Sequence, residues 1–320
     1  MVDAAQLTRL RLADAVPLAT ALAAHVARRV GVRVLFIKGP VAELQGLRAP
    51  HASLDVDLLV EPGGATRFVD GLRELGWHDR PGYRPLPLSG GHATTLIHDE
   101  WPCDIDVHFY WPGFAASTAE VFETLWARRA RVPIAGHRVD APSRTDGMLV
   151  LALHALRGSR TPGGTRAYRQ LVGRAHTAFD ERERELVRDA ALELGATVTA
   201  APFLRELGFA SPADADSEEA VLWRIRSEVS GGTADWLIEL RRTPWWRRPR
   251  VLFEAVFPSP SRLRMLHPEV GPGAGPVVAA WWRRLGNGIA ALPEARRATA
   301  SLRREARRSA RSRRQRAERG

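Results

Sequence analysis

The sequence has little cysteine and no long apolar run, and both absences restrict what the chain can be. Its single cysteine, Cys103, excludes an intrachain disulfide and any zinc site built from cysteines. The longest apolar run, Met148 to Leu156, falls well short of the about 18 to 20 residues that cross a bilayer. The first residues also lack the basic stretch and apolar core of a secretion signal. These features predict a cytoplasmic protein with no membrane span.

Lysine is equally scarce, because Lys38 is the only one among 47 basic residues and all the others are arginine. The net charge of +11 could indicate a nucleic-acid partner. Residues 294–320, however, contain eleven arginines against three glutamates, so the rest of the chain is almost neutral. This arginine-rich tail could make weak contacts with RNA or DNA, lie against an acidic membrane surface, or be a solvated tail.

Hydropathy patterns divide the 320 residues into two parts. Up to about residue 142, helices and strands alternate, which is typical of an α+β domain. An amphipathic helix over 5–30, or two helices split near Pro17, precedes the first strand. The expected strands cover 32–37, 54–60, 93–98 and 102–110, with further strand pieces within 131–139. The expected helices cover 40–47, a segment ending at Gly76, and 118–130, and residues 80–92 form a loop.

Beyond residue 142 every segment is predicted to be helical. The expected helices cover 144–157, 165–179, 181–195, 198–208, 217–229 and 233–242. We therefore predict an α+β domain over 1–142 and an all-α domain over 143–293 that shapes a substrate site. Residues 294–320 are an arginine-rich tail, either helical or disordered.

The segment richest in chemical groups is Ser53 to Val60, with Asp-Val-Asp at its centre. Side chains two apart on a strand point to the same side, so Asp55 and Asp57 share one face while Val56 enters the core. Two carboxylates held close together repel, and a hard divalent cation such as Mg²⁺ or Mn²⁺ relieves the repulsion. An Asp-x-Asp pair can also be a solvated strand end, but here Lys38-Gly39 and a short helix precede it.

A second alternating strand supplies a third carboxylate. Residues 103–109 read Cys-Asp-Ile-Asp-Val-His-Phe, with apolar odd positions and polar even positions. This pattern could place Asp106 beside the first pair, as a metal ligand or as general base for an incoming hydroxyl, with Asp104 as the alternative. His108 lies on the same polar face and could contact substrate or serve as a structural hydrogen-bonding partner.

These segments resemble a family of bacterial nucleotidyltransferases that share the DNA polymerase β-like catalytic fold. The common pattern is Lys-Gly, a short helix, Asp-x-Asp-Leu-Leu-Val and a later Asp-x-His, which here are Lys38-Gly39, residues 55–60 and residues 106–108. The resemblance continues over 149–156, the helical segments after it and, loosely, 257–266. It therefore covers most of the chain except the tail.

The resemblance implies a polymerase β-like domain with a mixed sheet and Mg²⁺ or Mn²⁺ held by Asp55, Asp57 and Asp106. It places the phosphates of a nucleoside triphosphate (NTP), such as ATP, near Lys38, Gly39 and Ser53. Two positions depart from the pattern. His51 stands where an arginine is common, with Arg48 as a nearby substitute, and Pro40 stands where a Ser or Thr often holds a phosphate oxygen.

Three further features have competing interpretations. His154 lies in the apolar run 148–156, where a core or interdomain histidine is favoured over a catalytic one. The pairs Trp245-Trp246 and Trp281-Trp282, each followed by two arginines, resemble a single-strand nucleic-acid platform. Adjacent helical residues diverge by about 100°, so we favour helix packing for both pairs.

The predicted activity is transfer of a nucleoside monophosphate from an NTP to a hydroxyl-bearing acceptor, with release of pyrophosphate. The acceptor could be a small molecule, a sugar, a peptide or protein side chain, or the end of a tRNA. The alternatives are a catalytically degenerate protein of the same fold that binds nucleic acid, and a tRNA-modifying toxin of that fold.

Overall fold

The protein is described by a computed structural model over residues 10–80, 92–158, 162–210, 245–249 and 270–290, with single positions at 223, 253, 257, 260, 263 and 293. Apart from Trp223, the helices expected over 217–229 and 233–242 lie outside the described residues, as does the tail 294–320.

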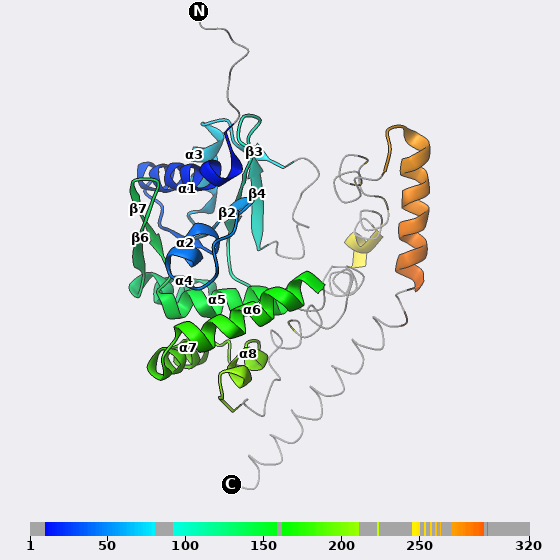
Figure 1. Cartoon of the computed structure of the whole chain (residues 1–320). Helices are drawn as coiled ribbons and strands as arrows, with labels where there is room; N and C mark the ends of the chain where they lie inside the picture. The colour runs from blue at the N-terminus through cyan, green and yellow to red at the C-terminus, as the bar shows by residue number, and fades with distance from the viewer. Residues whose placement is uncertain are drawn as a thin grey trace, which may run out of the picture.

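Helices and strands alternate in the first part of the chain (Figure 1). The strands are β1 (Val34–Ile37), β2 (Asp55–Val60), β3 (His78–Asp79), β4 (Ala93–Ile97), β5 (Asp104–His108), β6 (Ala130–Ile134) and β7 (His137–Ala141). The helices among them are α1 (Leu12–Arg29), α2 (Gly39–Leu44), α3 (Ala65–Arg73) and α4 (Thr118–Ala127). Then follow α5 (Arg144–Gly158), α6 (Pro162–Ala178), α7 (Glu181–Glu193), α8 (Ala201–Glu206) and the 3₁₀ turn η2 (Trp245–Arg247), and 274–290 is also helical.

Five strands form one mixed sheet in the order β1-β2-β5-β4-β3, and β6 and β7 form a separate hairpin. Only β2 and β5 run parallel, and the other neighbours are antiparallel. The α+β class, the mixed sheet and the antiparallel pairing of β4 with β5 are therefore confirmed. The two-residue β3 was not predicted, because two exposed residues carry no hydropathy period.

The sheet has two faces with different partners. Val56, Leu58 and Val60 of β2 enter a core that they share with residues of α1 and α3. Asp55, Asp57 and Leu59 point to the opposite face, where Leu59 belongs to a second core that includes much of α5. Figure 1 shows α1 and α3 on one side of the sheet and α5 and α6 on the other.

Helix α1 is one continuous helix, so the alternative of two helices split near Pro17 is wrong. Ala15, Ala19, Ala23 and Ala27 recur every fourth residue and are buried. This small-residue stripe lets the helix pack closely on the sheet, and that burial outweighs the local disruption by an internal proline.

The core beside α5 continues across the predicted domain boundary at residue 142. It joins Leu35 and Leu59 of the sheet to Met148 and Leu153 of α5 without interruption. Polar contacts bridge the same junction, because Gln45 Nε2 donates to the Pro142 carbonyl at 2.7 Å and Arg144 Nε donates to the Gln45 carbonyl at 3.0 Å. The division at 142 remains a prediction, and α5 is packed as part of the sheet layer.

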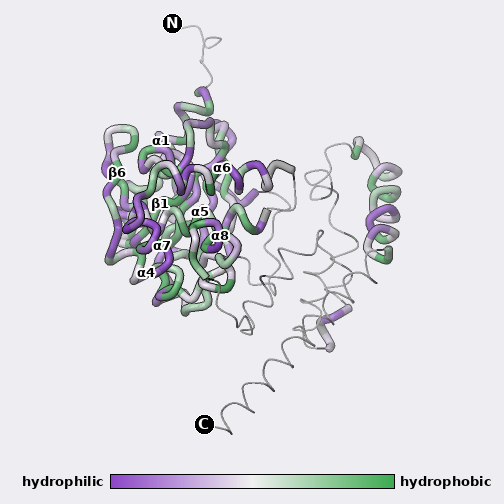
Figure 2. Tube along the Cα trace, turned by 60° about the horizontal axis from the view of Figure 1, so that its bottom comes forward, coloured by the Kyte–Doolittle hydropathy of each residue, from purple (hydrophilic) through white to green (hydrophobic). Residues whose placement is uncertain are grey.

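Helix α7 covers this assembly from outside, and Figure 2 shows it as hydrophilic along much of its length. Val187, Ala190 and Ala191 are its buried residues. Among the described residues, none of the helices combines the length and the hydropathy that a bilayer crossing requires.

Candidate active site

The sheet register aligns four residues from four strands in one row. Ile37 of β1 pairs with Asp57 of β2, Asp57 with Asp106 of β5, and Asp106 with Thr95 of β4. Cross-strand partners project to the same face, so this row lies on the face that carries Asp55. The parallel β2–β5 pair thus brings the Asp57 and Asp106 carboxylates together from positions far apart in sequence.

Asp57 is the most enclosed of these carboxylates, with 4% of its surface exposed. Its Oδ1 atom lies 2.7 Å from Lys38 Nζ and 2.9 Å from His108 Nε2. Burial opposes ionisation of Asp57, but the hydrogen bond from His108 and the charge of Lys38 outweigh it and lower the pKa. Asp57 is therefore held as a carboxylate.

Asp55 and Asp106 are shifted in the opposite direction. Burial and the charge of Asp57 raise the pKa of Asp55 to about 6. Burial also raises the pKa of Asp106, although Thr95 Oγ1 donates a 2.6 Å hydrogen bond to its Oδ1. Both carboxyls are therefore costly to ionise in the free protein, and a nearby cation would lower that cost.

A divalent cation fits this set of donors. Ligand atoms of Asp57, Asp106 and His108 all lie within 4.8 Å of one another. The grouping differs from the predicted set of Asp55, Asp57 and Asp106, because His108 comes closer than expected. His108 Nε2 is committed to Asp57, which is the contact of a supporting histidine. The remaining oxygens are the hard donors that Mg²⁺ and Mn²⁺ prefer.

Asp104, the alternative to Asp106, lies opposite Asp55 in the register. It forms an ion pair with Arg80. This pairing engages the Asp104 carboxylate with an arginine, whereas the side-chain hydrogen bond that Asp106 accepts from the described residues comes from the Thr95 hydroxyl.

The turn from β1 into α2 brings Lys38 and Gly39 beside the carboxylates. Both residues have positive φ angles, 59° and 44°. A β-carbon on Gly39 would lie 3.5 Å from Ser53 Oγ and 3.9 Å from the Asp55 carbonyl, so the turn fits closely against the start of β2. A positive φ is unfavourable for lysine, and the strained backbone points its ammonium at Asp57.

Arg48 lies close to His51, and its role as a substitute for the arginine missing there remains a prediction. Its Nη2 donates to Ser53 Oγ at 2.8 Å and to Glu43 Oε1 at 3.1 Å, and it lies 3.3 Å from His51 Nδ1. The His51 amide also donates to Glu43 Oε1. Arg48 therefore orders the loop before Asp55. Pro40 occupies the first turn of α2, where its missing amide hydrogen is tolerated.

A cationic and aromatic cluster borders the carboxylates and was not predicted. The Trp111 ring has Lys38 Nζ at 5.6 Å and the Arg157 guanidinium at 5.3 Å, and His108 packs edge-on against it. His154 stacks on the same ring at 6.2 Å. Trp111 lies shortly after the end of β5 and Arg157 lies in the last turn of α5, and no spacing pattern marks either residue.

His154 is exposed, so it is not a core histidine, and the alternative of an interdomain histidine remains a prediction. It lies 3.4 Å from Arg157 on the next turn of α5. Although part of the side chain is exposed, the ring stacks on Trp111, and desolvation there, together with Lys38 and Arg157, lowers the pKa of His154, so the ring is neutral near pH 7. Neutral imidazole beside two cations can accept a hydrogen bond.

Helix packing is also wrong for the first tryptophan pair, since Trp245 and Trp246 are 74% and 63% exposed. The two tryptophans of the second pair point in different directions, as adjacent residues of a helix must. Trp281 packs against a small cluster formed by Leu263, Val270, Val277 and Ala280, whereas Trp282 is exposed.

Comparison with known sequences identifies a family. The sequence profile described as "uncharacterised nucleotidyltransferase" matches residues 3–171, which include every residue of the candidate site. No curated protein matches the chain.

Several solved nucleotidyltransferase structures resemble this one at low similarity. The solution structure of the antibiotic-resistance factor ANT(2'')-Ia is 16% identical, with a TM-score of 0.36 over 55% of this chain and 93% of that one. The lincomycin-bound lincosamide adenylyltransferase LnuA is 13% identical, with a TM-score of 0.34 over 48% of this chain and 94% of that one. A tRNA-processing enzyme in an apo form is 15% identical, with a TM-score of 0.26 over 90% of this chain and 93% of that one. Scores this low support no conclusion about the acceptor.

Proposed function

We propose, from the premise that this chain belongs to the family of uncharacterised nucleotidyltransferases, that it transfers a nucleoside monophosphate from an NTP to a hydroxyl group. The observation that carries the proposal is the cross-strand pairing of Asp57 with Asp106, with Asp55 on the same sheet face. Even with Lys38 beside Asp57, Asp55 and Asp106 are costly to ionise, and a divalent cation would relieve that cost, which favours a metal-dependent enzyme over a degenerate binding protein.

In this proposal Asp55, Asp57 and Asp106 hold Mg²⁺ or Mn²⁺, and His108 orients Asp57. When bound, such ions neutralise the phosphate oxygens and stabilise charge on the attacking and leaving groups. His108 keeps one oxygen of Asp57 fixed by its 2.9 Å contact, so the carboxylate does not have to reorganise. Thr95 does the same for Asp106 through its 2.6 Å hydrogen bond.

The NTP phosphates lie, in this proposal, between Lys38 and the Gly39–Ser53 contact. Lys38 exchanges Asp57 for a phosphate oxygen and so offsets part of the triphosphate charge. Gly39 has no side chain of its own, so the Ser53 hydroxyl can approach the backbone of this turn closely. Arg48 and His51 keep the loop that carries Ser53 in place.

Asp106 is also proposed to take the proton of the acceptor hydroxyl, because the sheet register holds its carboxylate beside Asp57 on the face of the site. The acceptor oxygen forms a bond to the α-phosphorus, and the bond from that phosphorus to the β-phosphate oxygen breaks. Pyrophosphate leaves with the electron pair of the broken bond. The acceptor can be a small hydroxyl compound, a peptide or protein side chain, or a tRNA end.

The test is Mg²⁺-dependent release of pyrophosphate from each NTP in the presence of total cell extract. The wild type is compared with Asp55→Asn plus Asp57→Asn, and with Asp70→Asn as a matched loss of an exposed carboxylate on α3. Release that is lost only in the double variant supports the enzyme, and labelled NTP then traces the acceptor. Absence of NTP binding and turnover in the wild type would favour the degenerate binding protein.

A further inference from the structure

Helix α5 presents two residues beside the carboxylates that the proposed reaction leaves without a role. His154 and Arg157 are three apart in sequence, so they lie on neighbouring turns of one helical face. Desolvation has the largest effect on the pKa of His154, but the charges of Lys38 and Asp57 also shift it. This face of α5 therefore adjoins the candidate metal site.

Trp111 fixes the position of both side chains. The residue is 2% exposed, and its Nε1 atom donates to the Val150 carbonyl at 3.3 Å, so the indole is anchored to α5. The His154 ring stacks on the indole at 6.2 Å, and the Arg157 guanidinium lies 5.3 Å from the same ring. Lys38 Nζ lies 5.6 Å from it. One rigid aromatic side chain thus contacts two cations and an imidazole.

Arg157 determines which nitrogen of the His154 ring carries the proton. Its Nη2 atom lies 3.4 Å from His154 Nδ1, and its Nη1 atom lies 3.3 Å from His92 Nε2. A guanidinium can only donate hydrogen bonds, so both of these imidazole nitrogens accept. A neutral imidazole has one ring proton, which in His154 must then sit on Nε2.

His154 keeps this single proton over a wide pH range. Desolvation, together with the charges of Lys38 and Arg157, lowers the pKa of His154 to about 3. The side chain is partly exposed, and among the described residues its hydrogen bond is the one that it accepts from Arg157. The Nε2–H group is therefore a donor that a ligand can reach and that does not titrate near neutral pH.

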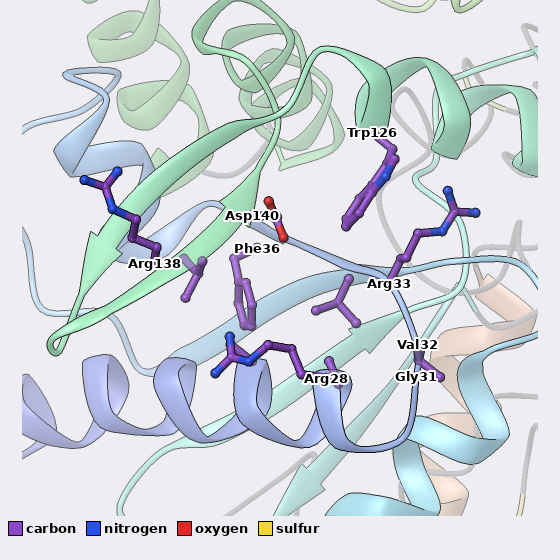
Figure 3. Close-up of a pocket in the computed structure, with 12 residues that line it drawn as sticks. Arg28, Gly31, Val32, Arg33, Phe36, Trp126, Arg138 and Asp140 are labelled. Carbon is purple, nitrogen blue, oxygen red and sulfur yellow. The ribbon is translucent and has the colours of Figure 1, made fainter.

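A second pairing of an arginine with a tryptophan shows the difference from a purely structural contact. Arg33 lies 5.4 Å from the ring of Trp126, and Figure 3 shows the two side by side. The guanidinium of Arg33 is held by Glu61 at 2.7 Å and by Glu123, so this cluster balances its own charge. Arg157 instead contacts two imidazoles, and one of them carries its proton on the nitrogen away from the arginine.

An oxyanion is the ligand that this arrangement fits. The Nε2–H group can only donate, and the charges of Lys38 and Arg157 near it favour an acceptor with negative charge over a neutral one. We propose that Arg157 holds His154 as the Nε2–H tautomer and that this group donates to a phosphate oxygen of the nucleotide. His154 is then a binding residue, and Arg157 is a positioning residue that acts through it. The phosphate rests on the proposed function, in which Lys38 turns to the triphosphate beside the same indole, whereas the tautomer does not.

Nuclear magnetic resonance of the full chain, labelled with ¹⁵N at histidine, measures the tautomer directly. We expect His154, assigned by the signal that His154→Asn removes, to show a protonated Nε2 and an unprotonated Nδ1 from pH 5 to pH 8. An Nδ1–H fraction should appear in Arg157→Met, because Nδ1 loses its donor, and be absent in Arg157→Lys. A protonated Nδ1 in the wild type, or the same tautomer in Arg157→Met, overturns the role of Arg157.

Two variants of His154 separate the functions of its ring nitrogens. Glutamine can place an amide N–H near the position of Nε2, whereas asparagine reaches only the position of Nδ1. Isothermal titration calorimetry with inorganic pyrophosphate and Mg²⁺ should show binding weakened at least about tenfold in His154→Asn, because a hydrogen bond to a charged group is lost. Affinity in His154→Gln should stay within about threefold of the wild type. His176→Asn, at an exposed histidine of α6, is the matched control and should change nothing.

The failure of this inference differs from the failure of the proposed function. Equal pyrophosphate affinity in His154→Asn and His154→Gln, with both variants shown to fold by thermal melting, would refute the donor role even in an active enzyme. The absence of pyrophosphate binding in the wild type would refute it as well. A wild type that binds pyrophosphate through His154 but releases none from any NTP would instead contradict the proposed function and leave this inference standing.

Discussion

Lys38 Nζ and Asp57 Oδ1 lie 2.7 Å apart, so the only lysine of the protein is paired with the most buried carboxylate of the candidate metal site. In the free protein the ammonium supplies the positive charge that a divalent ion would supply. Metal and NTP should therefore bind together, because the phosphates give Lys38 a new partner as it leaves Asp57.

Replacing Lys38 with Met should strengthen metal binding and weaken nucleotide binding. Without the competing ammonium, Mn²⁺ affinity in the absence of NTP should rise about tenfold or more, as loss of a partly buried charge contact implies. The NTP affinity of Lys38→Met should fall, because the phosphates lose their ammonium partner. Electron paramagnetic resonance of free Mn²⁺ measures the first effect, and Lys38→Arg, which keeps the charge, is the control. Unchanged Mn²⁺ affinity in Lys38→Met would show that the ammonium does not compete.

Asp55 should make the metal-free protein less stable as pH rises. Its folded pKa of about 6 lies above the ordinary value of 3.8, because burial and Asp57 disfavour its charge. A raised carboxyl pKa contributes stability that is complete below pH 3.8 and is lost as pH rises through 6. At pH 7 without metal, Asp55→Asn should therefore melt a few degrees above the wild type, by roughly 2 °C or more.

Added Mn²⁺ should reverse that order, because only the wild type retains the full set of carboxylates. The affinity of the wild type for Mn²⁺ should fall as pH drops below 6, because Asp55 then takes up a proton. Thermal melts at pH 5, 6, 7 and 8, with and without Mn²⁺, measure both effects. A wild type that melts above Asp55→Asn at pH 7 without metal would contradict the assignment.

Thr95→Val should move the acid limb of the pH–rate profile to higher pH. The hydroxyl of Thr95 lowers the pKa of Asp106, and its removal leaves the burial effect unopposed. We expect a reduced kcat near neutral pH that recovers at higher pH, and a profile close to wild type for Thr95→Ser. A kcat lowered equally at every pH would indicate that Thr95 acts only through packing.

Two carboxylates bound by the same arginine offer a matched stability test. Arg128 contacts both Asp146 and Glu193, but the Asp146 side chain is 1% exposed and the Glu193 side chain 54%. Asp146 also accepts from Ser143 at 2.7 Å at the start of α5. Asp146→Ala should cost about 2 to 4 kcal/mol, since it removes a buried partner, and Glu193→Ala less than about 1 kcal/mol. Urea unfolding measures both changes, and equal costs would exclude a structural role for burial of Asp146.

A fragment of residues 1–142 should not fold by itself. Its Leu35 and Leu59 share one core with Met148 and Leu153, and the fragment would expose that surface. A fragment extended to residue 210 should fold. Far-ultraviolet circular dichroism with cooperative urea unfolding distinguishes the two outcomes, and a cooperatively folded 1–142 fragment would support an independent domain.

The elements that sequence reasoning recovered are those with a local period. Alternation along 55–60 was enough to put Asp55 and Asp57 on the same face of one strand. Alternation along 103–109 likewise put Asp106 and His108 on the same face of a second strand. The ends of the helices differ from the predicted ends by several residues. Helix α1 begins at Leu12 where the prediction began at residue 5, and α8 covers Ala201–Glu206 where the prediction covered 198–208. Terminal turns carry few buried residues, so hydropathy does not fix them.

The site residues that the sequence did not predict are brought into place by contacts between segments that lie far apart in the chain. Thr95 contacts Asp106 only because of the β4–β5 register, and a one-residue slip would turn it to the other face. Arg157 meets Trp111 only because α5 packs on the sheet. Neither residue has a neighbour in sequence that reveals its role. The catalytic roles themselves remain predictions.

The lone lysine also makes the chain unusual as a target of amine chemistry. The enzymes that acetylate lysine side chains or attach ubiquitin to them require an ε-amino group, and the protein has one, with 13% of its side chain exposed. Any such modification therefore falls on Lys38 beside Asp57 and removes or alters the charge there. An amine-reactive inhibitor seated at this position would meet no competing lysine elsewhere in the chain.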